Sequence, residues 1–166
     1  MSNRIGDKMK LKEDKIKLFI RYLKENNKTI STMESCTGGY IANVITNVIG
    51  ASEVFKLGIV TYSNETKIIM GVSEKIIDKY TVYSKEVAYE MAFEITKKAN
   101  SDYGIGVTGI INSTNEVSLV YICIYDANNK KANYYTISAD MGERQENKII
   151  LANFIFDRLF ELCKLA

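Results

Sequence analysis

Thr29-Ile-Ser-Thr-Met-Glu34-Ser-Cys-Thr-Gly-Gly39-Tyr-Ile-Ala-Asn-Val44 is the stretch that best indicates the fold. It opens with a short β-prone run, residues 29–33, and residues 40–48 then place apolar side chains at helical spacing. Residues 34–39, with two glycines, form the connection between them. The stretch therefore predicts a strand, a tight turn and a helix, the unit from which α/β sheets are built.

Helices and strands are expected to alternate along the rest of the chain. The patterns predict helices at residues 11–26, 64–70, 73–79, 84–100 and 142–165, with Asn64 and Ser73 as N-caps. Strands are predicted at 58–63, 103–110, 117–125 and 133–138, the last two as an antiparallel hairpin around a turn at 126–130. We therefore expect one α/β domain over residues 9–166, after a flexible N-terminus at 1–8. Its fold would be a three-layer α/β/α sandwich around a mixed, mostly parallel sheet.

Composition restricts the class of partner. The 22 basic and 20 acidic residues leave a formal net charge of +2, which gives no global reason to expect DNA, RNA or an anionic membrane as a partner. No apolar run approaches the roughly 20 residues that span a bilayer, and the first residues have no apolar signal core. We expect a cytoplasmic protein that binds a small molecule, without a nucleic-acid or membrane partner.

The chain contains no histidine, and this limits its chemistry more than any residue that is present. Ser-His-Asp and Cys-His catalysis and an ordinary histidine-containing zinc site are excluded. The three cysteines, Cys36, Cys123 and Cys163, lie far apart and form no C-x-x-C pair. We expect no metal and no cofactor, and any catalytic base has to be Lys, Asp, Glu or Tyr.

The turn at residues 34–39 is the first candidate site. Where a strand ends and a helix begins, backbone N–H groups and the positive end of the helix dipole face whatever lies beside Ser35. An oxyanion or phosphate beside a nucleophilic Ser35 would be stabilised there, and the arrangement is akin to the nucleophile elbow of other hydrolases. The alternative is that Ser35 or Thr37 caps the helix and that Gly38 and Gly39 serve packing.

Residues 61–67, Thr-Tyr-Ser-Asn-Glu-Thr-Lys, also run from a strand end into a helix start. Strand ends of an α/β sheet gather in one crevice, which would bring Tyr62 and Lys67 towards Ser35. A lysine removes a serine proton only if its pKa falls from about 10.4 towards neutrality, and a phenol could relay the proton. On spacing alone, Lys67 could equally be a solvated helix residue and Tyr62 a half-buried strand aromatic.

Further candidates lie near these turns. Cys36 is an intrinsically better nucleophile than serine, but no histidine exists to pair with it. Glu34 could act as a general acid or base, or could cap its neighbours. Thr108 and the Gly109 backbone, at another strand end, could contact a ligand or be part of a packed terminus. Arg144, at the start of the last helix, could clamp a phosphate or be an ordinary surface residue.

Taken together, these blocks resemble the competence/damage-inducible protein A (CinA) C-terminal domain family over about residues 29–165. The matching blocks, in chain order, are residues 34–39, 60–67, 71–72, 82–88, 107–110 and 142–144. Members of the family hydrolyse nicotinamide mononucleotide to nicotinic acid mononucleotide and ammonia without a metal, and a homodimer is the implied assembly. The implied fold is a three-layer α/β/α sandwich.

Carried over by motif, the resemblance gives each candidate a role. Ser35 would be the nucleophile, Lys67 its base and Tyr62 the assisting hydroxyl. The substrate-binding residues implied or considered are Glu34, Cys36, Thr37, Gly38, Gly39, Thr108, Gly109 and Arg144. One block departs from the family, because residues 110–117, Ile-Ile-Asn-Ser-Thr-Asn-Glu-Val, lack the usual glycines and proline and are several residues shorter. The alternatives are therefore an amidase of altered specificity or a non-catalytic nucleotide-binding domain.

Overall fold

The computed structural model describes residues 10–165, so the flexible N-terminus expected at residues 1–8 lies outside the described residues. Five strands form the sheet: β1 (Ile30–Glu34), β2 (Phe55–Val60), β3 (Tyr103–Gly109), β4 (Leu119–Asp126) and β5 (Lys131–Ser138). The α-helices are α2 (Glu13–Glu25), α3 (Tyr40–Thr46), α4 (Asn64–Ile69), α5 (Glu74–Tyr80), α6 (Lys85–Ala99) and α7 (Arg144–Leu162), and a 3-10 turn, η1 (Ala51–Glu53), precedes β2. The predicted alternation of helices and strands is confirmed.

The strand order is β2-β1-β3-β4-β5. β1 pairs in parallel with both β2 and β3, whereas β4 is antiparallel to both β3 and β5. Four strands therefore run in one direction and β4 alone in the other. The sheet is mixed, as expected, and the β4–β5 hairpin is confirmed.

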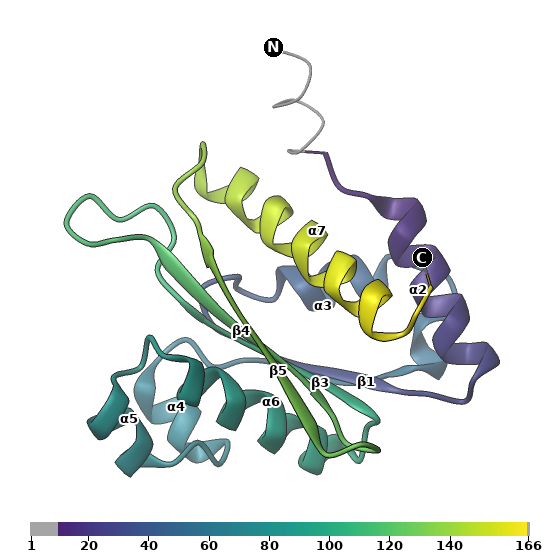
Figure 1. Cartoon of the computed structure of the whole chain (residues 1–166), viewed down its shortest axis with the longest axis horizontal. Coiled ribbons are helices and arrows are strands. Elements are labelled where there is room, and N and C mark those ends of the chain that lie inside the picture. The colour runs from purple at the N-terminus through teal and green to yellow at the C-terminus, as the bar shows by residue number, and fades with distance from the viewer. Residues whose placement is uncertain (1–9, 166) are drawn as a thin grey trace.

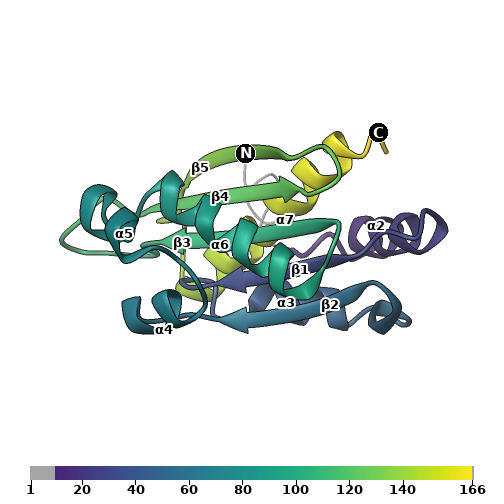
Figure 2. The same cartoon turned by 90° about the horizontal axis from the view of Figure 1, so that it is seen from below.

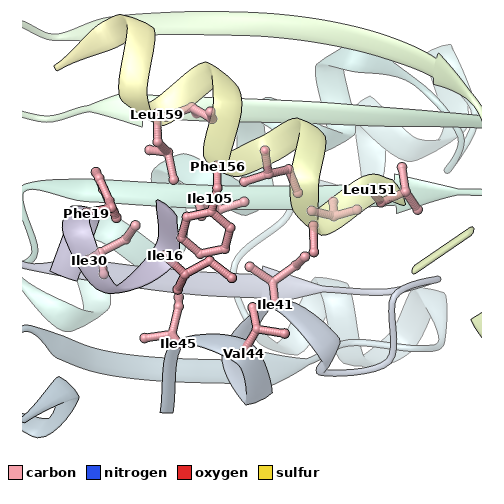
Figure 3. Packing of buried hydrophobic residues seen from close by; sticks show 14 of the residues in the cluster. Ile16, Phe19, Ile30, Ile41, Val44, Ile45, Ile105, Leu151, Phe156 and Leu159 are labelled. Carbon is pink, nitrogen blue, oxygen red and sulfur yellow. The ribbon is translucent and has the colours of Figure 1, made fainter. Parts of the chain in front are cut away.

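Helices cover both faces of the sheet, which confirms the three-layer sandwich (Figures 1 and 2). α2, α3 and α7 lie on one face, and α4, α5 and α6 on the other. Phe156 of α7 and Phe19 of α2 pack with Ile105 of the central strand β3 in the larger core (Figure 3). On the second face Met33 of β1 packs with Val87, Met91 and Ile95 of α6. Burial of these side chains stabilises each layer by about 1.5–3 kcal/mol per residue.

A close helix–sheet contact is made at Gly106 of β3. A Cβ atom there would lie 2.1 Å from the carbonyl oxygen of Ala88 and 2.6 Å from the amide nitrogen of Ala92, both on α6. Only glycine permits this approach. α6 is thereby held close to the strand that ends at the candidate site.

Several boundaries differ from the sequence prediction, and those nearest the candidate site are at β2 and α4. β2 begins at Phe55 rather than Gly58, because Phe55 and Leu57 pair with Ile30 and Ser31 of β1. The strand consequently ends at Val60, and Ser63, not Asn64, is the N-cap of α4. The Ser63 hydroxyl accepts from the Thr66 amide, which completes a capping box. Ser84 caps α6, whereas the predicted cap Ser73 stands at the N-cap position of α5 but makes no side-chain cap bond.

Candidate active site

β1 and β2 end at one level beside Ser35, and the parallel β3 continues to Gly109. Glu34, the last residue of β1, pairs with Val60 of β2 and with Val107 of β3. The next residues after β1 and β2, Ser35 and Thr61, therefore emerge side by side, and the Thr61 amide donates to the Glu34 carbonyl at 2.8 Å. This is the edge at which α/β sheets gather functional groups.

Ser35 and Lys67 are in direct contact. Lys67 Nζ lies 3.1 Å from Ser35 Oγ, and it donates a second hydrogen bond to the Thr61 carbonyl oxygen at 2.7 Å. Lys67 is 1% exposed and Ser35 7% exposed. The carbonyl and the hydroxyl fix the amine at the serine, so the predicted meeting of these two residues is confirmed as a contact.

Burial lowers the pKa of Lys67 from its ordinary value, because the ammonium form loses its hydration. Among residues 10–165, no carboxylate lies within ion-pair distance of the Lys67 amine. The environment therefore favours a neutral amine, whose lone pair can accept the serine proton.

Burial favours the neutral form of Cys36, next to Ser35, as it does for Lys67, but for a thiol this raises the pKa. Burial raises the pKa of its thiol to about 12, an effect that outweighs the positive charges of Arg144 and Lys67. A thiol with that pKa is protonated at neutral pH and is a weak nucleophile. The hypothesis of a cysteine nucleophile receives no support from this geometry.

Glu34 holds the turn together. It is 0% exposed, and its carboxylate accepts from the amides of Ile41 and Ala42 at 3.1 and 2.8 Å and from the Thr37 hydroxyl at 2.7 Å. The alternative of a capping role therefore describes both Glu34 and Thr37. Neither residue lines the pocket beside Ser35, and a substrate contact by Glu34 or by the Thr37 amide stays a prediction.

The two glycines of the turn have positive φ angles, +62° at Gly38 and +87° at Gly39, which explains their presence. The Gly38 amide donates to the Ser35 carbonyl at 2.9 Å, so it is not available for a ligand. Within the described part of the chain, the amides of Cys36 and Thr37 donate to no other residue, although the Cys36 amide contacts its own thiol. Of the turn amides, that of Cys36 is the one beside the pocket and the nucleophile.

A pocket of about 180 Å³ opens above Ser35 and Lys67. Its other lining residues are Cys36, Tyr62, Asn64, Val82, Tyr83, Gly109, Ile110, Ile111 and Arg144. The volume is smaller than the ~300–1,000 Å³ typical of sites that enclose a drug-sized ligand. It is large enough for a ring with a carboxamide, whereas a whole nucleotide would extend beyond it.

Tyr62 lines this pocket but stands apart from the Ser35–Lys67 contact. Its side chain is 66% exposed, and among residues 10–165 its hydroxyl makes no hydrogen bond with Ser35 or Lys67. A role as assisting hydroxyl would require substrate to bring the phenol into the network.

The remaining candidates, Gly109, Arg144 and Thr108, differ in whether they line the pocket. Gly109 and Arg144 line the pocket, and an Arg144 guanidinium N–H donates to the Ile111 carbonyl. Thr108 does not line it, because its buried hydroxyl donates to the Val82 carbonyl at 2.9 Å. Thr108 therefore supports the segment at Val82 from behind the pocket, and its contact with a ligand stays a prediction.

A protein-family model described as the CinA C-terminal domain matches residues 12–163. The chain belongs to the CinA C-terminal domain family. It is 39% identical over 143 residues to a CinA-like protein of Endomicrobium trichonymphae, an alignment that covers 84% of this chain and 33% of that protein. A CinA-like protein of Kosmotoga olearia is 43% identical over 114 residues, which cover 65% of this chain and 28% of the relative. The chain thus spans about a third of the length of these relatives.

Solved CinA-type structures have the same fold. A crystal structure of the competence/damage inducible protein CihA from Agrobacterium tumefaciens superposes with a TM-score of 0.84 at 26% identity, over 91% of this chain and 94% of that one. The competence damage-inducible protein A from Klebsiella pneumoniae reaches 0.85 at 18% identity, over 93% and 98% of the two chains.

Several residues of this CinA domain that matter for the pocket were missed from sequence. Asn64, Val82, Tyr83, Ile110 and Ile111 line it, and their place at strand ends and helix starts was the available signal. Asn147 was also missed: it is buried on α7, accepts from the Met141 amide at 3.1 Å and donates to Asn112 Oδ1 at 2.8 Å. It connects two loops at the pocket, and nothing in its local sequence indicates this.

Residues 10–165 contain neither a candidate membrane-spanning helix nor a candidate metal-binding cluster. No helix there is both long and apolar enough to cross a bilayer. No group of three or more Cys, Asp or Glu side chains is placed to hold a metal ion in that range.

Proposed function

We propose that this CinA domain hydrolyses the carboxamide of nicotinamide mononucleotide, or of a closely related phosphorylated amide, to the acid and ammonia. The observation that carries the proposal is the buried contact between Ser35 Oγ and Lys67 Nζ at the floor of a pocket. A lysine that burial deprives of hydration is a known partner for a catalytic serine. With this reaction we propose a cytoplasmic homodimer.

In the acylation step the neutral Lys67 amine accepts the Ser35 proton as Oγ forms a bond to the carboxamide carbon. The carbonyl oxygen of the substrate becomes an oxyanion. The backbone amide of Cys36, which follows Ser35 and lines the pocket, is the proposed hydrogen-bond donor to it. Lys67, now an ammonium, returns the proton to the amide nitrogen. The carbon–nitrogen bond breaks, ammonia leaves, and a seryl ester remains.

In the deacylation step water replaces ammonia. Lys67 accepts a proton from the water as its oxygen bonds to the ester carbon, and the carbon–Oγ bond then breaks. Lys67 gives that proton to Ser35 Oγ, and the carboxylic acid is released. The hydrogen bond from Lys67 to the Thr61 carbonyl keeps the amine in place through both steps.

The phosphate of the substrate would lie outside the small pocket, near the start of α7. Arg144 lines the rim, and Lys148 follows one helical turn later, with its Nζ 3.4 Å from where a Cβ on Gly38 would lie. Among residues 10–165 neither cation has a carboxylate within ion-pair distance. Two unpaired cations on one side of the pocket suit an anionic group.

The test is ammonia release from nicotinamide mononucleotide by the purified chain. We expect turnover by the wild type and a loss of about 10³-fold or more in kcat for Ser35→Ala, since the nucleophile is removed. Cys36→Ala is the matched control, because its protonated thiol takes no part, and it should retain activity within a few-fold of wild type.

Two results would contradict the proposal. Equal activity in Ser35→Ala and wild type would remove the serine mechanism. Binding of the nucleotide by calorimetry with no ammonia release across a broad pH range would favour a non-catalytic binding domain. Ammonia release from other amides alone would instead mean that the short segment after Ile110 has changed the specificity.

A further inference from the structure

The segment between α5 and α6 presents an aromatic ring to the active-site pocket. Tyr83 lines the pocket and is 43% exposed. Among residues 10–165 its hydroxyl has no hydrogen-bond partner and its ring has no aromatic or cationic neighbour. A large ring that packs against no other ring at the mouth of a pocket is available to a ligand.

The backbone on either side of Tyr83 is fixed in place. The Thr108 hydroxyl donates to the Val82 carbonyl at 2.9 Å, and the Ser84 hydroxyl donates to the Thr81 carbonyl at 2.9 Å. Thr81 itself has φ +66°, a strained angle for a β-branched residue that persists only where the surroundings enforce it. Contacts with β3 and α6 thus fix the backbone at Tyr83 before any ligand binds. This lowers the backbone entropy lost on binding.

The other walls of the pocket suit a flat ring. Tyr62 contributes a second exposed ring, and Val82 and Ile110 contribute apolar surface. No acidic residue lines this pocket. A positive charge on a bound ring could therefore be stabilised by the faces of the two tyrosines and by no carboxylate of the lining.

We propose that Tyr83 is a specificity-determining residue that selects a cationic aromatic ring, an N-substituted pyridinium carboxamide, over neutral amides of similar size. This inference rests on the proposed function, because it assigns the ring that carries the scissile carboxamide. The carboxamide would point to Ser35, and the ring would lie against Tyr83.

The experiment measures binding in the Ser35→Ala variant, which cannot turn the ligand over. Calorimetry compares nicotinamide mononucleotide with its reduced 1,4-dihydropyridine form, which has the same ribose phosphate but a neutral, non-aromatic ring. We expect the oxidised form to bind about tenfold more tightly, the size of a partly desolvated cation–π contact. Adding Tyr83→Leu should reduce this preference to about twofold or less, whereas Tyr83→Phe should keep it.

Tyr80→Leu is the matched control. Tyr80 is a 37% exposed tyrosine on the neighbouring helix end that does not line the active-site pocket, so its replacement should leave the preference unchanged. Thermal unfolding of each variant checks that the fold is intact, and Tyr83→Met takes the place of Tyr83→Leu if the latter does not fold.

Equal binding of the two forms, no binding of either, or a preference that survives Tyr83→Leu would overturn the inference. These outcomes are distinguishable from failure of the proposed function. Wild-type turnover without a ring preference removes the role of Tyr83 alone, whereas ring preference without ammonia release leaves Tyr83 as a ligand-binding residue and removes the amidase.

Discussion

At the scale of single residues, the chemistry depends on what burial does to two neighbours of Ser35. Loss of hydration lowers the pKa of Lys67 and raises that of Cys36, so one becomes a candidate base and the other an inert thiol. The sequence could predict that Ser35 and Lys67 meet, because both follow strand ends. It could not predict that Glu34, Thr37 and Thr108 direct their side chains into the protein, since that depends on the hydrogen bonds formed in the folded turn.

The pKa of Lys67 predicts the direction of the pH dependence. In the proposed mechanism the neutral amine is the active form, so kcat/KM should rise with pH through the lysine pKa and reach its plateau below the ~10.4 of a free lysine. Lys67→Arg, which stays charged, should lose about 10²–10⁴-fold in kcat, and the acid limb should disappear from any residual rate. Steady-state ammonia assays from pH 5 to about 10 measure this. A profile that is flat in the wild type would be inconsistent with Lys67 as the base.

At the scale of elements, the active-site turn depends on a carboxylate that replaces the usual N-cap. Gly39 stands at the N-cap of α3 and has no side chain, and Glu34 accepts from the first helical amides in its place. The strand–turn–helix pattern was predictable from residues 29–48. The start of β2 and the N-cap of α4 were not, because an edge strand with alternating exposure and an internal glycine has a weak pattern, and both Ser63 and Asn64 are good caps.

Glu34→Gln is expected to destabilise the fold. One carboxylate oxygen becomes an NH₂ group that faces a backbone donor, and a lost buried acceptor costs about 1–3 kcal/mol. For a domain of this size the melting temperature should fall by about 2–4 °C for each kcal/mol. Thermal and urea unfolding measure the change, with the exposed Glu74→Gln in the first turn of α5 as the matched control. The same small effect in both variants would contradict the capping role.

At the scale of the whole molecule, the pocket joins both helical layers across the end of the sheet. Asn64 of α4 and Tyr83 before α6 come from one layer, and Arg144 of α7 comes from the other. Periodicity gave the three layers correctly, because each helix has an apolar face to bury. Periodicity did not predict which segments form the pocket. That depends on single polar contacts between distant residues, such as the hydrogen bond from Asn147 to Asn112.

Asn147→Ala is expected to raise KM more than it lowers kcat. It frees the Met141 amide and Asn112, so the segments that carry Ile111 and Arg144 lose a shared support, while Ser35 and Lys67 on the sheet edge are unaffected. We expect KM for the amide substrate to rise about tenfold, equivalent to about 1.4 kcal/mol. Asn133→Ala, which removes a hydrogen bond on the distant part of β5, is the control. An unchanged KM with only a lower melting temperature would make Asn147 purely structural.

The separation of Ser35–Lys67 from residues 110–118 has a consequence for how such a domain diversifies. Ser35 and Lys67 follow β1 and β2, whereas residues 110–118 form the separate connection between β3 and β4. Substrate range and reaction type are thus inherited through different parts of the chain. An engineer could exchange this connection for a longer one and obtain new amidases with the same nucleophile and base.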